Sequence, residues 1–171
     1  GKNTYSGGTT VNGTLGVADV ASLPISTLPY DATVNANATL EFSANGTSPT
    51  NILLAEPSAH LETLGGDITF AGFIQGTGTL NVAGGSKTTL TNPLNTYTGG
   101  TVVFDSSVLQ VISQTLPVAQ SNTSVTLQGT STLEFNQSGP GTYAGSIDLS
   151  DPGSKVLVSG GPLTLSGALA G

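Results

Sequence analysis

Short alternations of apolar and polar residues run through most of the chain. The apolar members lie two residues apart and the residues between them are mostly Thr, Asn, Ser and Glu, as in the pairs Leu40 and Phe42, Ile68 and Phe70, Leu80 and Val82, Val125 and Leu127, Leu133 and Phe135, Ile147 and Leu149, Val156 and Val158, and Leu163 and Leu165. Because successive side chains of a strand point to opposite faces, both apolar residues of a pair share one face. The pattern predicts short strands, buried on one face and solvated on the other, and it predicts no helix.

The sequence also repeats itself over a long interval. Residues 3–12 read NTYSGGTTVN and residues 95–104 read NTYTGGTVVF. The match continues, at an offset that grows slightly along the chain, through Leu23-Pro24 and Leu116-Pro117, Thr39–Phe42 and Thr132–Phe135, and Gly65-Gly66 and Gly160-Gly161. We therefore expect a single repeat region over residues 1–171, with long repeats at about 1–94 and 95–171, the second truncated, as a fragment of a longer array.

This repetition selects between two folds that suit short strands. An antiparallel sandwich and a solenoid both accommodate them, but a solenoid stacks similar layers, each of which needs only its neighbours for burial. The sequence therefore predicts an all-β fold, a parallel β-helix (β-solenoid), with roughly 20 to 25 residues per coil and about seven coils over roughly 30 to 35 Å. Phe42 and Phe135, at matching repeat positions, are expected to stack inside the rod.

Composition and charge narrow the functional classes. Aromatic residues make up 5% of the chain, charged residues make up 8%, and cysteine is absent, so neither a thick core nor disulfides support the fold. The net charge is −7, and the only cations are the isolated Lys2, Lys87 and Lys155. Nucleic-acid binding needs clustered Lys and Arg, so no nucleic-acid partner is expected. No apolar run is long enough to predict direct membrane insertion by this segment.

The repeated motif resembles the autotransporter-associated β-strand repeat. Thr77–Leu94 supply its first strands, Asn95–Val103 its central motif, and Asn3–Leu15 a second copy. The resemblance implies a right-handed parallel β-helix in the passenger of a type V secretion autotransporter, displayed on the bacterial cell surface or secreted. Asp105-Ser106-Ser107-Val108-Leu109 replace the Gly-Thr-Leu that the family has after the central motif, so the resemblance does not predict the conformation of that turn. The residues that carry the motif are Asn3, Thr4, Tyr5, Gly7, Gly8, Asn95, Thr96, Tyr97, Gly99 and Gly100.

The motif has a structural and a functional interpretation. In the structural one Asn caps a turn, Tyr packs across the corner, and Gly-Gly supplies positive φ. In the functional one Tyr5 and Tyr97 form a platform on which a sugar ring stacks. The structural interpretation is the one we adopt.

Other polar residues also receive structural interpretations. Glu41 and Glu134 recur at equivalent positions, which is typical of a repeated solvated face and not of one catalytic pair. His60 is the only histidine, and Gly65-Gly66-Asp67 is a single approach to the repeated calcium-binding turn. Threonine-rich segments at 88–91 and 130–132 predict no regular threonine face. We therefore expect no catalytic, cofactor or metal site and no enzyme activity.

The predicted function is a structural or interaction segment: a β-helix stalk that contributes to adhesion or fibre formation. The alternatives are an enzyme that acts on polysaccharides and the oligomerising body of a secreted toxin. Expected partners are a host cell, a glycan or further copies of the chain in a fibre or homo-oligomer.

Overall fold

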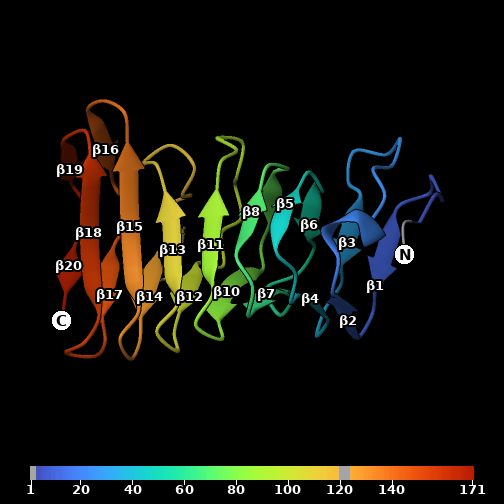
Figure 1. Ribbon diagram of the computed structural model, residues 1–171, viewed down its shortest axis with the longest axis horizontal. Coiled ribbons are helices and arrows are strands. Elements are labelled where there is room, and N and C mark those ends of the chain that lie inside the picture. Colours follow the sequence, from blue (N-terminus) through green and yellow to red (C-terminus); the bar gives the residue numbers. More distant parts are fainter. Residues whose placement is uncertain (1–2, 120–123) are drawn as a thin grey trace.

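The chain folds into a rod of stacked coils, a β-solenoid in which all strand pairs are parallel (Figure 1). This computed structural model describes residues 3–119 and 124–171, so Lys2 lies outside the described residues. The N-terminal coil lies at one end of the rod and the C-terminal coil at the other. Within the described part the only helical element is the 3-10 turn η1 (Val20–Ser22), and no helix is long and apolar enough to cross a membrane. The predicted all-β solenoid is confirmed.

Four parallel sheets form the sides of the rod. Sheet A contains β1 (Thr9–Val11), β3 (Ala32–Val34), β6 (Ile52–Leu54) and β9 (Ile74–Gly76). Sheet B contains β2 (Thr14–Val17), β4 (Thr39–Phe42), β7 (His60–Leu64), β10 (Thr79–Ala83), β12 (Thr101–Val103), β14 (Val125–Leu127), β17 (Ile147–Leu149) and β20 (Leu169–Ala170). Sheet C contains β5 (Gly46–Ser48), β8 (Ile68–Phe70), β11 (Lys87–Leu90), β13 (Val108–Val111), β15 (Thr132–Gln137) and β18 (Lys155–Gly160), and sheet D contains β16 (Gly141–Tyr143) and β19 (Leu163–Leu165).

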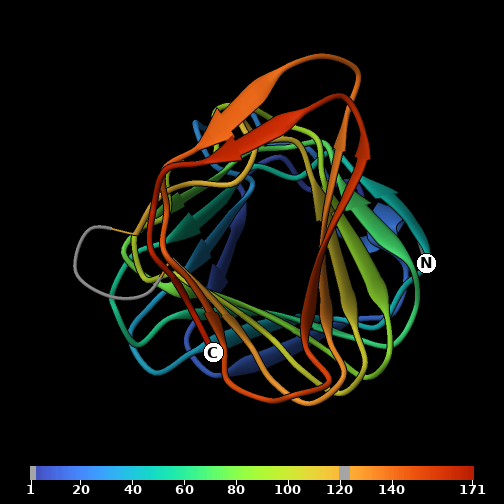
Figure 2. The same ribbon diagram turned by 90° about the vertical axis from the view of Figure 1, so that its left-hand side faces the viewer.

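The order in which the chain visits these sheets changes along the rod. From β3 to β11, strands of sheets A, B and C follow one another along the sequence. From β11 to β15 the strands alternate between sheets C and B, and in the last coils the strands of sheet D come between those of sheets C and B. Viewed along the rod, the coils have a roughly triangular outline (Figure 2). Sheet B links eight strands by seven steps, which agrees with the predicted number of coils.

Register between coils shows that the coil length is variable. Leu15 pairs with Leu40, whereas Leu61 pairs with Leu80, so the second of these coils is several positions shorter than the first. Both coil lengths are close to the range that the sequence predicts. Strand pairing is therefore constant while the connecting turns absorb the differences in length.

The core is a thin column of stacked aliphatic and aromatic side chains. In sheet B the inward positions Leu40, Leu61 and Leu80 are fully buried on three successive strands. Burial of each such side chain contributes about 1.5 to 3 kcal/mol relative to full exposure. The period-two pairs identified in the sequence are thus the inward residues of these strands.

The interior also holds many hydroxyl groups, although Ser and Thr were expected to be solvated. Thr63 and Thr88 are fully buried and their hydroxyls are 2.8 Å apart inside the rod. At the corner between sheets B and C, Ser86 and Ser107 are buried on successive coils: Ser86 Oγ donates to the Ala83 carbonyl at 2.8 Å. Ser107 Oγ accepts from the Gly85 N–H of the preceding coil at 3.1 Å, so both buried hydroxyls have partners at this corner.

The two long repeats do not place equivalent strands on the same side of the rod. Thr39–Phe42 form β4 in sheet B, whereas the matching Thr132–Phe135 begin β15 in sheet C. From β4, four steps along sheet B lead through β7, β10 and β12 to β14, and β15 is the next strand along the chain. The offset between the two long repeats therefore spans four full coils plus one side of a coil.

This shift places the two repeated phenylalanines in different surroundings. Phe42 packs edge-to-face on Phe70, with ring centroids 5.2 Å apart, and Phe135 packs on Tyr143 at 5.4 Å. Both phenylalanines are buried as expected, but they lie on different sides of the rod. Both lie next to valines in register, Phe42 beside Val17 and Phe135 beside Val111 and Val158, so the expected stacking inside the rod is found.

The turn at Asp105 and Ser106 carries backbone strain. Asp105 and Ser106 have φ of +57° and +62°, a region that disfavours residues with a Cβ. In the preceding coil the same corner is occupied by Gly84 and Gly85, with φ of +71° and +69°. The chain path at this corner is thus the same in both coils even where glycine is absent.

At the C-terminal end of the rod the inward residues of the last coil are uncovered. Val158 is 45% exposed and Leu169 is 55% exposed, although their partners Phe135 and Ile147 in the preceding coil are buried. This end therefore presents both apolar side chains and the unpaired edge of β18.

A double-mutant cycle tests the shift of the repeat by one side. Replacement of Phe42 and Phe70 by Leu, singly and together, should show a coupling of about 0.5 to 1.5 kcal/mol in unfolding free energy, because their rings touch. The same cycle on Phe42 and Phe135 should show additive effects. Urea denaturation followed by circular dichroism measures both, and coupling of the second pair but not the first would refute this packing.

Candidate functional site

The repeated motif begins with an asparagine that joins neighbouring coils. Asn95 is only 5% exposed; its Oδ1 accepts from the Ile74 backbone N–H at 2.8 Å and its Nδ2 donates to the Thr115 carbonyl at 2.8 Å. In the first copy, Asn3 Nδ2 donates to the Ser22 carbonyl at 2.7 Å. The two copies thus make the same contact to the following coil.

The motif tyrosines make the same local hydrogen bond but differ in burial. The hydroxyl of Tyr97 is 2.7 Å from Thr101 Oγ1, and that of Tyr5 is 2.5 Å from Thr9 Oγ1. Tyr97 is 1% exposed, and this burial raises the pKa of its hydroxyl well above the usual value. Tyr5 lies in the first described coil and is 44% exposed. A sugar platform is therefore excluded at Tyr97, whose ring has no free face.

The glycines of the motif serve two different needs. The second glycine of each pair has positive φ, +73° at Gly8 and +87° at Gly100. The first glycine of the second pair, Gly99, is held by a close approach: an added Cβ would lie 2.5 Å from the Gly78 carbonyl oxygen. The predicted positive φ is thus found at one glycine of each pair.

The two repeated glutamates have opposite electrostatic surroundings. Glu41 lies directly opposite Glu62 on the outer face of sheet B, and His60 lies on the same face and the same strand as Glu62. Desolvation, and then the charge of Glu41, raise the pKa of Glu62, while His60 opposes the shift. Glu134 instead accepts from Gln110 Nε2 and Ser159 Oγ, each at 3.0 Å. Glu41 and Glu134, although equivalent in the repeat, therefore lie on different sides of the rod and have different charged and hydrogen-bonding neighbours.

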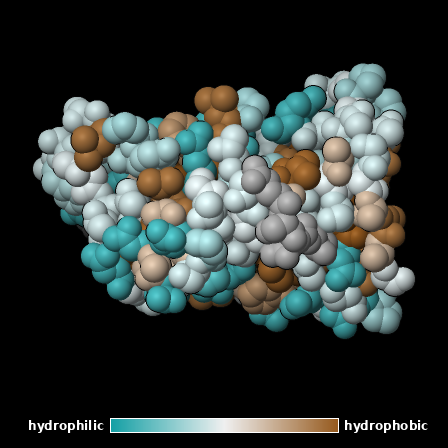
Figure 3. Space-filling model, turned by 180° about the vertical axis from the view of Figure 1, so that it is seen from behind, coloured by the Kyte–Doolittle hydropathy of each residue, from teal (hydrophilic) through white to brown (hydrophobic). Residues whose placement is uncertain are grey.

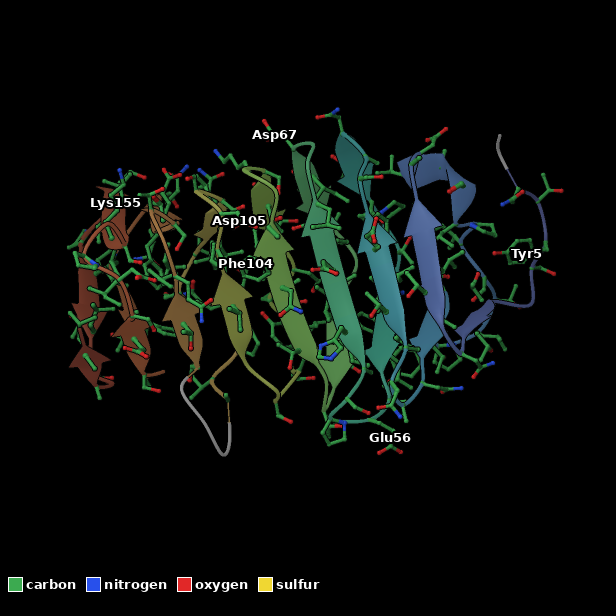
Figure 4. The ribbon with its side chains drawn as sticks, turned by 90° about the horizontal axis from the view of Figure 1, so that it is seen from below. Tyr5, Glu56, Asp67, Phe104, Asp105 and Lys155 are labelled. Carbon is green, nitrogen blue, oxygen red and sulfur yellow. The ribbon has the colours of Figure 1, made fainter. Side chains whose placement is uncertain are left out.

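Several aspartates accept hydrogen bonds in or next to turns. Asp67, at one edge of the rod in Figure 4, accepts from the Lys87 backbone N–H at 3.0 Å. Asp151 accepts from the Gly129 N–H at 2.8 Å, and Asp148 accepts from Ser150 Oγ at 3.0 Å. Across residues 3–119 and 124–171, no three His, Cys, Asp or Glu side chains gather in a way that would hold a metal ion.

A surface with several polar side chains lies on the outer face of sheet C. Two adjoining hollows of about 370 Å³ and 240 Å³ share Thr89, Thr91 and Gln110. We call them together the polar groove, which is lined by Asp67, Ile68, Thr69, Lys87, Thr89, Leu90, Thr91, Gln110, Val111, Ile112 and Asn136. These residues belong to or adjoin β8, β11, β13 and β15, which lie side by side across the front of Figure 1.

A central column of polar side chains runs through the groove. Thr47, Thr69 and Thr89 occupy the same outward position on three successive strands, followed by Gln110 and then Glu134. Sequence reasoning missed this column because the spacing varies from one coil to the next. An alignment of each predicted strand with the next would have shown that these polar residues lie side by side.

The groove carries a connected set of polar contacts. Thr89 Oγ1 donates to Gln110 Oε1 at 3.4 Å, and Gln110 Nε2 donates to Glu134 Oε2 at 3.0 Å. Lys87 Nζ lies 4.0 Å from the same Glu134 oxygen. Lys87 therefore offsets part of the negative charge at the groove, and the Gln110 amide is held in place by Thr89 and Glu134. On the opposite side of the rod, apolar residues form small separate patches among polar ones (Figure 3).

Comparison with known proteins adds no relative: no family model, curated protein or solved structure matches the chain. The motif residues and the geometry of the rod are therefore the basis for a function.

Removal of the motif asparagine should affect the two copies unequally. Asn95→Ala leaves the Ile74 N–H and the Thr115 carbonyl without these buried partners and should lower the unfolding free energy by about 2 to 4 kcal/mol. Asn3→Ala, which removes one exposed bond, should cost about 0.5 to 1 kcal/mol. Urea denaturation of both variants measures the difference, and equal losses would contradict the proposed role of Asn95.

Glu62 should weaken the rod at neutral pH. The pKa of Glu62 is raised in the folded chain, so folding favours the protonated carboxyl. The ionised carboxylate therefore lowers the free energy of unfolding. This loss is complete above the folded-state pKa and disappears as the pH falls below the ordinary pKa of a glutamate. Glu62→Gln should therefore stabilise the chain at about pH 7, by roughly 0.2 to 1 kcal/mol, and have little effect near pH 4.

The matched control is Glu134→Gln, in which the lost charge accepts two hydrogen bonds. This change should lower stability at neutral pH. Denaturation curves at both pH values test the pair, and stabilisation of equal size by the two substitutions would show that net charge, and not the Glu41–Glu62 contact, sets the effect.

Proposed function

We propose that the chain is a structural segment of a type V autotransporter passenger, displayed on the bacterial surface or secreted. In that setting it acts as a stalk that contributes to adhesion or fibre formation. The observation that carries the proposal is the recurrence of the Asn-Thr-Tyr-Ser/Thr-Gly-Gly motif with the same contacts, Asn3 to Ser22 and Asn95 to Thr115, in a parallel β-solenoid.

The construction of the rod suits export of an unfolded chain. Cysteine is absent, so no disulfide closes a loop before passage through a narrow pore. Each coil is hydrogen-bonded to adjacent coils, as β10 is to β7 and β12. A chain of this kind can fold coil by coil, because each new coil needs only the one before it as a template.

The dimensions and surface of the rod suit a stalk. Seven parallel steps extend the molecule in one direction, and its outer faces carry hydroxyl, amide and carboxylate groups.

Surface labelling of intact source cells tests the proposal. Antibodies raised against the folded chain should label unpermeabilised cells or the culture medium, and external protease should remove the cell-bound signal. A cytosolic protein probed in parallel controls for lysis. Signal that appears only after permeabilisation, with none in the medium, would rule out display and secretion.

A further inference from the structure

We propose that the polar groove on sheet C binds a linear, uncharged glycan that lies along the axis of the rod. This proposal names a ligand class for the proposed adhesive role. Its biological meaning rests on that proposed function. Binding itself is a property of the groove and is measured on the isolated chain.

The direction of the groove points to an extended ligand. It crosses β8, β11 and β13 and reaches Asn136 of β15, so it runs across the strands and hence along the rod. Adjacent strands are about 4.8 Å apart, which places Thr69, Thr89 and Gln110 at regular intervals along the floor. A chain of sugar units offers hydroxyl donors and acceptors repeatedly along its length, as this floor does.

The charges at the groove disfavour an anionic ligand. Lys87 Nζ lies 4.0 Å from Glu134 Oε2, and Asp67, which accepts from the Lys87 backbone N–H, also lines the groove, so one ammonium group and two carboxylates lie there. The whole chain carries a net charge of −7, which repels polyanions. Hydroxyl and amide groups are therefore the recognition elements, with the partly exposed Ile112 as the apolar contact at one side.

Backbone pairing argues for a glycan over an extended peptide. A peptide gains affinity mainly by adding a strand to an open sheet edge. The groove lies over β11 and β13, which are paired on both sides, β11 with β8 and β13, and β13 with β11 and β15. A ligand there meets side chains only, and a glycan needs nothing else.

Titration of the isotope-labelled chain with uncharged oligosaccharides tests the proposal. Hexamers of β-linked glucose, mannose and xylose are the probes. At least one should shift the amide signals of β8, β11 and β13 in a saturable way, with weak affinity because hydrogen bonds exchange with water. The double variant Thr89→Val, Gln110→Ala should weaken that binding about tenfold or more.

The matched control is Thr126→Val, Asn81→Ala, which removes the same kinds of group from the outer face of sheet B. It should leave binding within about twofold. The wild-type shift map locates the site even if the groove variant fails to fold. No binding by any probe, shifts confined to other faces, or equal effects of the two variants would overturn the proposal.

An uncharged extended hexapeptide serves as the competing ligand. If it bound the groove and the oligosaccharides did not, the glycan assignment would be replaced by a peptide site. Surface labelling of cells does not depend on Thr89 or Gln110, so failure of glycan binding is distinguishable from failure of the autotransporter proposal.

Discussion

Parallel hydrogen bonding between successive coils is the interaction on which the rest of this structure depends. It holds register from β2 to β20 in sheet B although the length of the intervening chain differs from one coil to the next. With register maintained, small changes in the turns do not disturb the column of inward Leu, Val and Phe side chains. The same register decides which outward residues become neighbours, and hence where polar surfaces form.

Much of the architecture was predictable because it depends on short-range pattern. The period-two pairs such as Leu40 with Phe42 and Leu80 with Val82 lie in strands and face inward, as the alternation indicates. Coil length and coil number also followed from the repetition. The buried Thr63 and Thr88 were not predicted, because a hydroxyl that finds a partner inside the rod is indistinguishable in sequence from a solvated one.

The candidate sites were harder to predict because they depend on pairing between coils. Glu41 and Glu62 are separated by a whole coil of chain, as are Thr69 and Thr89, yet each pair is adjacent in register. With variable coil lengths, no single period in the sequence identifies such neighbours. The equivalence of Glu41 and Glu134 was correctly read from the repeat, but it did not reveal that they face different sides of the rod.

The repeat of four coils plus one side has a consequence for any longer array of such units. Each further copy would present its motif turned by about a third of a revolution from the copy before it, so that three copies complete the circle. Equivalent features would then follow a helical path around the rod. A rod built in this way offers each of its features in every direction, and contact with a surface does not depend on how the rod is rotated about its own axis.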